Sequence, residues 1–386
     1  MNSSVVVGLG YGDEGKGSMV NFLCKKYYKK PLVVRYSSGH QVGHTVVEGD
    51  KRHVFSNFGS GTLSNAPTYW SEYCTVNPSA IRSEGKALAA LKVFPTLYIN
   101  DNAMITTPYD ILKNRMVETK NRHGSVGVGF GTTIQRNEDH FKLYARDLRY
   151  PKVFEAKLKQ ISDVYYKETF KEYPADYIEK HIANFKADCK HILHECMFSS
   201  SLWEVLEHGY YKHIIFEGNQ GIMLDQDFGF FPNVTRGSTT SKNAFELMKS
   251  IKMNPSNADV YYITRAYATR HGNGELANEG MPTSYIKDNP LETNVLGEFQ
   301  GHFRKAPLDL ETLKYAMSCD KTFNQNGTSM LAVTCLDQIP ERIPIINGDK
   351  IDLLYPSQIG SILNISPQNI LVSNSDKGLF VNPIEL

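Results

Sequence analysis

The sequence has little of what marks secreted, membrane or nucleic-acid-binding proteins. Its 386 residues include six cysteines with no CxxC pair, which argues against a disulfide framework or a cysteine zinc site. No apolar run approaches the length of a membrane-spanning helix, and the N-terminus lacks the pattern of a signal peptide. Basic and acidic residues nearly cancel, at 42 against 41. The chain therefore lacks the basic excess that is typical of nucleic-acid-binding proteins. We therefore expect a soluble cytoplasmic protein that binds small molecules.

Short β-branched runs alternate with segments of helical periodicity along most of the chain. The clearest strand candidates are 5–9, 32–36, 214–216, 260–264 and 330–334. Residues 16–28 have helical spacing, so the chain opens with a strand, a glycine loop and a helix. This alternation predicts an α/β fold, with a mainly parallel central sheet and helices on both faces. Residues 152–212 are charged and aromatic-rich, and we interpret them as a helical insertion in a single domain over 1–386.

The glycine loop between the first strand and the first helix fits GxxxxGK, from Gly10 to Lys16. In this pattern glycines bring backbone N–H groups close to phosphate oxygens, and the lysine adds a positive charge. Gly17 follows where the common phosphate loop has Ser or Thr, so the usual magnesium-binding hydroxyl is missing. Asp13 inside the loop can supply a carboxylate oxygen to Mg²⁺ instead. The alternative is a plain glycine turn, which two adjacent acids and a lysine disfavour.

Six motifs, in order, resemble those of the adenylosuccinate synthetase family. GYGDEGKG at 10–17 resembles WGDEGKG, with Tyr11 in place of tryptophan, and VRYSSGHQVGHT at 34–45 resembles VRYQGGHNAGHT. The remaining matches are FEGNQG at 216–221, LDQDFG at 224–229 with PNVT at 232–235, AYATRHG at 266–272 (KAYSTRVG in the family) and TCLD at 334–337 (TKLD). They extend from residue 5 to about 340, with a weaker match near Ser373. The chain is thereby identified as a member of this family.

The resemblance implies a nucleoside-triphosphate- and Mg²⁺-dependent carbon–nitrogen ligase. In that reaction a carboxylate removes the proton from purine N1, O6 attacks the γ-phosphate, and the amino group of L-aspartate displaces phosphate from C6. Asp13 would be the base and a Mg²⁺ ligand, His44 would stabilise the developing charge, and Lys16 would neutralise the β- and γ-phosphates. Gly43 would offer the metal its carbonyl oxygen. His40, in the same loop, is interpreted as an ordinary polar residue.

The same motifs imply three groups of binding residues. Gln220 offers a donor and an acceptor to the purine edge, and Thr235 with the loop 124–131 would hold the 5′-phosphate. An arginine of a neighbouring subunit would also contact that phosphate, with Arg136 and Arg146 as candidates. The residues expected at the triphosphate are Gly12, Asp13, Glu14, Gly15, Lys16, Gly17, Gly43, His44, Thr45, Arg304, Asp337 and Ser373. Those expected at the acceptor nucleotide are Asp13, Gln41, Ser125, Val126, Gln220, Leu224 and Thr235. Those expected at L-aspartate are Thr269, Arg270, Gln300, Gly301, His302 and Arg304.

Three departures from the family pattern bear on the substrates. His302 stands where the family has an arginine that contacts the ribose 2′-OH, and loss of that donor removes a preference for ribonucleotides. Gln41 replaces an asparagine near the acceptor phosphate. Cys335 replaces the lysine that packs on a guanine donor, which leaves Asp337 without its companion. Together these changes resemble the phage branch of the family, which makes N6-succino-2-amino-2′-deoxyadenylate from dGMP, L-aspartate and ATP for diaminopurine DNA.

We therefore expect the dGMP- and ATP-dependent reaction, in the host cytoplasm if a phage encodes the chain. An adenylosuccinate synthetase that uses IMP and GTP is the alternative, and an inactive nucleotide-binding regulator is an alternative of another class. The presence of Asp13, Lys16 and His44 argues against the inactive regulator. By resemblance we also expect a homodimer whose partners are these small molecules, with no nucleic acid and no membrane.

Overall fold

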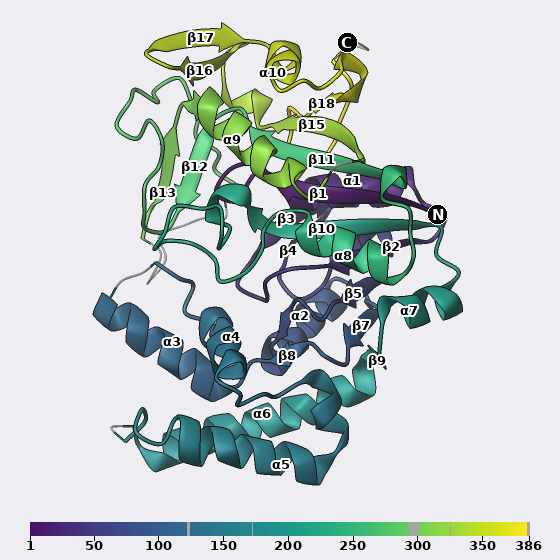
Figure 1. The fold of residues 1–386 in the computed structure, drawn as a ribbon, viewed down its shortest axis with the longest axis vertical. Coiled ribbons are helices and arrows are strands. Elements are labelled where there is room, and N and C mark those ends of the chain that lie inside the picture. Colours follow the sequence, from purple (N-terminus) through teal and green to yellow (C-terminus); the bar gives the residue numbers. More distant parts are fainter. Residues whose placement is uncertain (122–123, 172, 293–300, 325, 384–386) are drawn as a thin grey trace.

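The computed structural model describes residues 1–121, 124–171, 173–292, 301–324 and 326–383. Its centre is a nine-stranded sheet in the order β18-β15-β11-β1-β10-β2-β5-β7-β9, in which all neighbouring strands run parallel (Figure 1). These strands are β1 (Asn2–Gly8), β2 (Pro31–Arg35), β5 (Thr68–Trp70), β7 (Leu97–Asn100), β9 (Met197–Ser199), β10 (His213–Gly221), β11 (Ala258–Arg265), β15 (Thr328–Thr334) and β18 (Ile370–Val372). The predicted α/β fold with a mainly parallel sheet is confirmed.

The central strand β1 is covered by helices on both sides. Val6 packs with the apolar face of α1 (Lys16–Lys26). Val5 belongs to the cluster that contains α8 (Lys242–Ser250) and α9 (Leu310–Lys321). Because side chains alternate between the two faces of a strand, a strand covered on both sides is mostly apolar on both faces. This explains the unbroken valine run of β1 and the helices on both faces.

The other helices and strands flank this core. The helices are α2 (Pro78–Ala90), α3 (Pro108–Asn121), α4 (Phe130–Glu138) and α10 (Pro356–Ile362). Three strand pairs form small sheets, β3 (His44–Glu48) with β4 (Lys51–Phe55), β6 (Thr75–Val76) with β8 (Met104–Ile105), and β12 (Ala268–His271) with β13 (Phe303–Ala306). A three-stranded sheet consists of β14 (Leu308–Asp309), β16 (Ile343–Asn347) and β17 (Lys350–Leu354).

The predicted helical insertion, 152–212, is helical over most of its length. It contains α5 (Pro151–Gln160), α6 (Ala175–Glu195) and α7 (Leu202–Gly209), and α5 and α6 form the lowest layer in Figure 1. One part differs from the prediction, because β9 pairs in parallel with β7 and is the edge strand of the central sheet. Three residues are too few to show an alternating pattern, so the sequence does not reveal this strand. A single domain over 1–386 stays a prediction.

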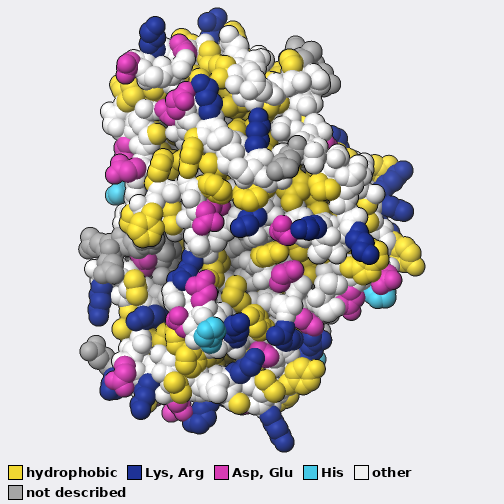
Figure 2. Space-filling view, viewed as in Figure 1, with side chains coloured by type: hydrophobic (Ala, Val, Ile, Leu, Met, Phe, Trp, Pro, Cys, Tyr) yellow, Lys and Arg dark blue, Asp and Glu magenta, His cyan; other side chains and the backbone are white. Residues whose placement is uncertain are grey.

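Two surface properties follow the composition. Within the described residues, no helix has the length and apolar content that crossing a bilayer requires. Figure 2 shows basic and acidic side chains interspersed on one face of the molecule, whose net charge is +1.

The carboxyl ends of β1, β10 and β11 meet at one edge of the sheet. There β1 leads into the glycine loop, β10 ends in the FEGNQG motif, and β11 ends at Arg265. Parallel sheets bind ligands at this edge, where neighbouring strands lead away in opposite directions. Several predicted site residues lie at this edge, since Asp13 and Lys16 follow β1 and Gln220 lies near the end of β10.

Candidate active site

Glu14 occupies the inside of the phosphate loop. Its Oε1 accepts hydrogen bonds from the backbone N–H of Gly10 at 3.0 Å and of Gly12 at 2.8 Å, and its Oε2 pairs with Lys16 Nζ. Lys16 is only 2% exposed. Burial works against ionisation, yet the Lys16 charge and the N–H donors hold the pKa of Glu14 below its usual value. The predicted phosphate-binding lysine therefore neutralises a carboxylate of its own loop in this conformation.

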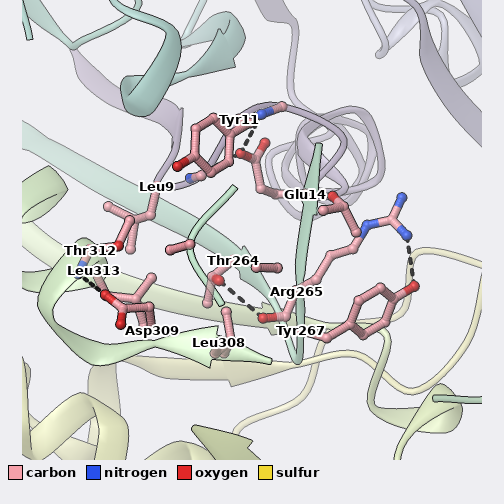
Figure 3. Close-up of a pocket in the computed structure, with 15 residues that line it drawn as sticks. Leu9, Tyr11, Glu14, Thr264, Arg265, Tyr267, Leu308, Asp309, Thr312 and Leu313 are labelled. Carbon is pink, nitrogen blue, oxygen red and sulfur yellow. Dashed lines mark hydrogen bonds between the residues drawn. The ribbon is translucent and has the colours of Figure 1, made fainter. Parts of the chain in front are cut away.

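A small cavity lies behind this loop. Figure 3 shows Glu14 and Tyr11 on one side of it and Thr264, Leu308 and Asp309 on the other. Its volume is about 30 Å³, enough for one or two water molecules and far too small for a nucleotide. The predicted residues Gly12, Glu14 and Thr269 line this cavity. The nucleotides must therefore bind elsewhere.

Asp13 faces a larger cavity of about 410 Å³, which we name the donor cavity. Burial raises the pKa of the Asp13 carboxyl, while the charges of Arg265 and Lys16 oppose that rise. A carboxylate that binds its proton more tightly is a stronger base, which suits removal of a proton from a purine nitrogen. The predicted triphosphate residues that line this cavity are Asp13, Gly15, Asp337 and Ser373, with Thr334 and Cys335 between them.

Asp13 also fits the predicted magnesium site. Mg²⁺ in nucleotide-binding proteins takes one or two carboxylates and completes its octahedron with phosphate oxygens and water. Asp13 is partly exposed in the donor cavity, directly beside the loop backbone, and can provide one such carboxylate. Gly43, the second predicted ligand, is exposed and precedes β3. Among the described residues no group of three acidic, histidine or cysteine side chains could hold a metal without a nucleotide.

His44 begins β3 and is held between two acceptors. Its Nδ1 lies 2.6 Å from Glu217 Oε1, and its Nε2 lies 3.0 Å from the backbone oxygen of Asn219. Both ring nitrogens of His44 therefore face groups that accept hydrogen bonds in this conformation. To donate to a substrate oxygen, His44 has to exchange the Asn219 carbonyl for that oxygen.

Glu217 is fully buried and was not predicted from the sequence, although it lies in the FEGNQG motif. Burial opposes its ionisation, but Arg35 and His44 lower the pKa of Glu217 to about 2. Arg35 Nη1 is 4.0 Å from Glu217 Oε1, and the backbone N–H and hydroxyl of Ser60 also donate to this carboxylate. Glu217 is therefore an anion that holds His44 in place.

Gly17 brings His44 next to the phosphate loop. A Cβ at this position would lie 2.8 Å from the Cβ of His44 and 3.0 Å from Ser60 Oγ. Only glycine permits this approach, which gives a packing reason for the missing Ser or Thr of the common phosphate loop. Gly17, His44 and the adjoining Thr45 thus form one contact between α1 and β3.

A second large cavity, of about 370 Å³, collects most of the residues predicted for the acceptor nucleotide, and we name it the acceptor cavity. Thr235 is bonded to two other residues of its wall. The Thr235 hydroxyl donates to Gln220 Oε1, and the Thr235 N–H donates to the Leu224 carbonyl at 2.8 Å. Asn114 Nδ2 donates to Ser125 Oγ at 3.0 Å. The predicted residues on its wall are Gln41, Ser125, Val126, Gln220, Leu224 and Thr235. Asp13 is not among the residues that line it.

The residues predicted for L-aspartate lie on β12 and β13, which pair antiparallel. Arg270, on the wall of the acceptor cavity, donates to the carbonyls of Glu275 and Asn233 at 2.6 and 2.9 Å. Arg304 pairs with Glu279 at 2.6 Å and also donates to two backbone carbonyls. Gly301 accepts from the His271 ring, His302 is exposed and lines none of these cavities, and Gln300 lies outside the described residues.

The structure excludes one of the two arginines predicted to reach the acceptor phosphate of a neighbouring subunit. Arg136 is fully buried, with Nε and Nη2 at 2.8 and 3.0 Å from the Asp110 carboxylate, so it cannot reach another subunit. Arg146 is exposed and bonds Asn102, which leaves it as a candidate. Arg236 and Arg270 also line the acceptor cavity, although the sequence motifs do not assign either to this phosphate. His40 bonds Asn77 at 3.1 Å, in keeping with its interpretation as a polar loop residue.

Comparisons with known proteins identify the family of the chain. The sequence model described as adenylosuccinate synthetase matches residues 5–352. Adenylosuccinate synthetases of Helicobacter acinonychis and Helicobacter pylori strain 26695 are 30% and 31% identical to the chain, each over 95% of this chain and 85% of the relative.

Two solved structures share the fold. The fully ligated adenylosuccinate synthetase of Plasmodium falciparum has a TM-score of 0.71 at 21% identity, over 94% of this chain and 86% of that one. The succinoaminodeoxyadenylate synthetase of cyanophage S-2L, bound to dGMP and dATP, has a TM-score of 0.61 at 16% identity, over 98% and 93%. With the family match and the close curated relatives, these findings show that the chain belongs to the adenylosuccinate synthetase family of nucleoside-triphosphate-dependent carbon–nitrogen ligases.

Proposed function

We propose that the chain phosphorylates O6 of a purine nucleotide and then joins L-aspartate to C6, with dGMP as the acceptor and ATP as the donor. The observation that carries this proposal is the position of His44. It contacts Gly17 of the phosphate loop on one side and the Asn219 carbonyl on the other, next to Gln220 on the acceptor cavity. A residue in this place can reach an oxygen that passes from the purine to the γ-phosphate.

In the first step Asp13 takes the proton from purine N1. The electron pair moves onto O6, which bonds to the γ-phosphorus while the bond to the β–γ bridging oxygen breaks and nucleoside diphosphate leaves. His44 donates a hydrogen bond to the oxygen that carries the developing charge. Bound Mg²⁺, held by Asp13 and phosphate oxygens, would neutralise the charge on the triphosphate.

In the second step the amino nitrogen of L-aspartate bonds to C6 and gives up a proton to solvent, and the C6–O6 bond breaks so that O6 leaves with the phosphate. Arg270 and Arg304 are the cations on β12 and β13 that suit the carboxylates of L-aspartate, because guanidinium groups bind carboxylates in a bidentate manner. Arg304 has to leave Glu279 to do so, and that pair is partly exposed to solvent. Such a pair is weak enough to be exchanged.

The choice of dGMP and ATP rests on the departures from the family pattern. Guanine has the same N1–H and O6 as hypoxanthine, so Asp13 and His44 act on either base. Cys335 lies on the donor cavity where the family has a lysine against guanine, which favours a donor other than GTP. Gln41 lies on the acceptor cavity in place of the family's asparagine.

IMP with GTP is the second candidate. Two observations favour it. The curated relatives at about one-third identity are named adenylosuccinate synthetases, and Asp337 keeps its place on the donor cavity, where a carboxylate can accept from guanine N1–H and the 2-amino group.

The test is a four-way assay of dGMP or IMP with ATP or GTP, in the presence of Mg²⁺ and L-aspartate. Phosphate release and the mass of the nucleotide product are measured together. We expect the highest kcat/KM for dGMP with ATP. The mass of the nucleotide product should equal that of dGMP plus L-aspartate minus water. Preferential turnover of IMP with GTP would replace the first candidate by the second. No aspartate-dependent release with any pair would favour the inactive nucleotide-binding regulator.

A further inference from the structure

Arg265, at the end of β11, joins the phosphate loop to the donor cavity. Its side chain is 8% exposed and borders both the small cavity behind the loop and the donor cavity. Its Nε donates to the backbone oxygen of Asp13. Its Nη1 donates to the Tyr267 hydroxyl at 2.9 Å and to Glu292 Oε2 at 3.2 Å. Figure 3 shows the guanidinium group turned toward the Tyr267 ring and away from Leu308 and Asp309.

The contact with Asp13 has a consequence for the backbone of the loop. Asp13 has a φ of 63°, a left-handed conformation that costs free energy for a residue other than glycine. Arg265 holds the carbonyl of Asp13, and Thr334 Oγ1, at the end of β15, donates to the carbonyl of Glu14 at 2.8 Å. In a trans peptide the N–H points opposite to the C=O. Because Arg265 and Thr334 hold these two carbonyls, the N–H groups of Glu14 and Gly15 point away from Arg265 and Thr334.

Arg265 is also the cation of the donor cavity. Among the described residues that line this cavity it is the one lysine or arginine, beside the carboxylates of Asp13, Asp337 and Asp376. Lys16 does not line it and is engaged by Glu14. A triphosphate entering the cavity meets three acids, so a fixed positive charge is needed there.

We propose that Arg265 is a positioning residue of the phosphate loop, one that holds Asp13 in its left-handed backbone conformation and gives the donor cavity its positive charge. The proposal rests on the function proposed above. Tyr267 supports this arrangement, because its hydroxyl receives the Arg265 hydrogen bond and donates to Gln338 Oε1 at 2.5 Å. The family motif KAYSTRVG has lysine in place of Arg265, and lysine keeps the charge without the planar fork of donors.

The test compares R265M and R265K with R342M, a matched control at an exposed arginine that stacks on Tyr355. For R265M we expect kcat/KM for the donor triphosphate to fall about 10- to 100-fold, the range for a lost charged hydrogen bond. The KM for the acceptor nucleotide should change less than about threefold. R265K should recover to within about tenfold of wild type, and R342M should match wild type.

Two further measurements keep the outcome clear. Y267F removes one partner of Arg265 and keeps the charge, so its donor KM should rise about three- to tenfold even if R265M does not fold. Calorimetric binding of a non-hydrolysable ATP analogue with Mg²⁺ tests Arg265 independently of turnover. If wild-type protein turns over no nucleotide pair but R265M still weakens this binding, the proposed function fails and the role of Arg265 stands. Unchanged donor binding in both R265M and Y267F, or an equal rise in both KM values, overturns it.

Discussion

At the scale of single residues, two adjacent acids of the phosphate loop have opposite surroundings. The Glu14 carboxylate is enclosed by two N–H groups and Lys16, which stabilise its charge. Asp13 lies against the donor cavity, and its burial raises the pKa of its carboxyl. One acid is thus fixed as an anion that organises the loop, and the other is suited to take up a proton.

The first prediction concerns Asp13→Ala. We expect kcat to fall by at least about 100-fold, the usual contribution of a general base, because no other carboxylate of the loop is free to accept the N1 proton. Affinity for the acceptor nucleotide should stay within about tenfold, since its cavity is lined by other residues. Steady-state kinetics and calorimetric titration with the acceptor measure the two quantities. A variant that keeps a large share of the wild-type rate would remove Asp13 from the role of base.

The second prediction concerns stability and His213, which is 5% exposed, bonded to Ser4 Oγ at 2.9 Å and stacked on Tyr27. Burial, with help from Lys26, lowers the pKa of His213 to about 4. In the unfolded chain a histidine takes up a proton near pH 6.5, so between about 6.5 and 4 protons favour unfolding. The free energy of unfolding should therefore fall as the pH is lowered through this window.

H213Q keeps a side chain that can bond Ser4 and removes the titration. Between about pH 7.5 and about pH 5, the loss of unfolding free energy should be smaller in this variant by about 2 kcal/mol. Urea unfolding at both pH values measures it. An equal loss in wild type and variant contradicts the assignment.

At the scale of elements, the sequence predicted what local pattern determines and missed what distant contacts determine. β1, β2, β10, β11 and β15 are buried on both faces, so their β-branched runs were visible. The spacing of GxxxxGK predicted the glycine loop. The family motifs predicted which residues line the acceptor cavity. The edge strand β9 left no such pattern.

The residues missed in the site share one property. Glu217 contacts His44 across 173 positions, and Arg265 contacts Asp13 across 252 positions. Neither contact follows from spacing along the chain, because it depends on how β10 and β11 lie beside β1. Likewise, the Lys16–Glu14 pair and the burial of Arg136 depend on packing that periodicity does not specify.

The third prediction uses the same substitution at two glycines. A Cβ at Gly221, the last residue of β10, would lie 2.0 Å from the Gly10 carbonyl oxygen, so Gly221→Ala should displace the phosphate loop. We expect a loss of about 1–3 kcal/mol in stability together with loss of turnover. Gly85 lies inside α2, and the nearest atom to its added Cβ is 4.0 Å away. Gly85→Ala should stabilise the protein by about 0.5–1 kcal/mol and leave turnover unchanged. Thermal unfolding and kcat of both variants decide the matter.

At the scale of the whole molecule, the donor and acceptor cavities have no lining residue in common. Between them lies His44, which contacts Gly17 of the phosphate loop and bonds Asn219, the residue before Gln220 of the acceptor cavity. The acceptor cavity is bordered by Arg236 and Arg270, whereas the exposed Arg146 lies outside it. If the predicted homodimer forms, the exposed Arg146 is the remaining candidate of the two arginines for contact with the neighbouring subunit's acceptor nucleotide.

The fourth prediction tests this sharing by mixing inactive variants. In a homodimer, Arg146→Ala should weaken acceptor binding enough to abolish turnover at low acceptor concentration, and Asp13→Ala should abolish turnover at any concentration. A one-to-one mixture then contains dimers with one intact site, and about a quarter of wild-type activity should return. Light scattering should give twice the chain mass of 43.5 kDa. A monomeric mass, or full activity of Arg146→Ala alone, rules out this arrangement.

The ion pair inside the phosphate loop has a consequence for which anions can enter. Two backbone N–H groups and Lys16 already bind the Glu14 carboxylate, which belongs to the same loop. Any anion that enters the loop therefore competes with a carboxylate that is always present at high local concentration. A singly charged ion such as chloride or acetate forms too few contacts to displace this carboxylate. A triphosphate with its metal offers several contacts at once, so we expect only a multiply charged ligand to displace Glu14 from these donors.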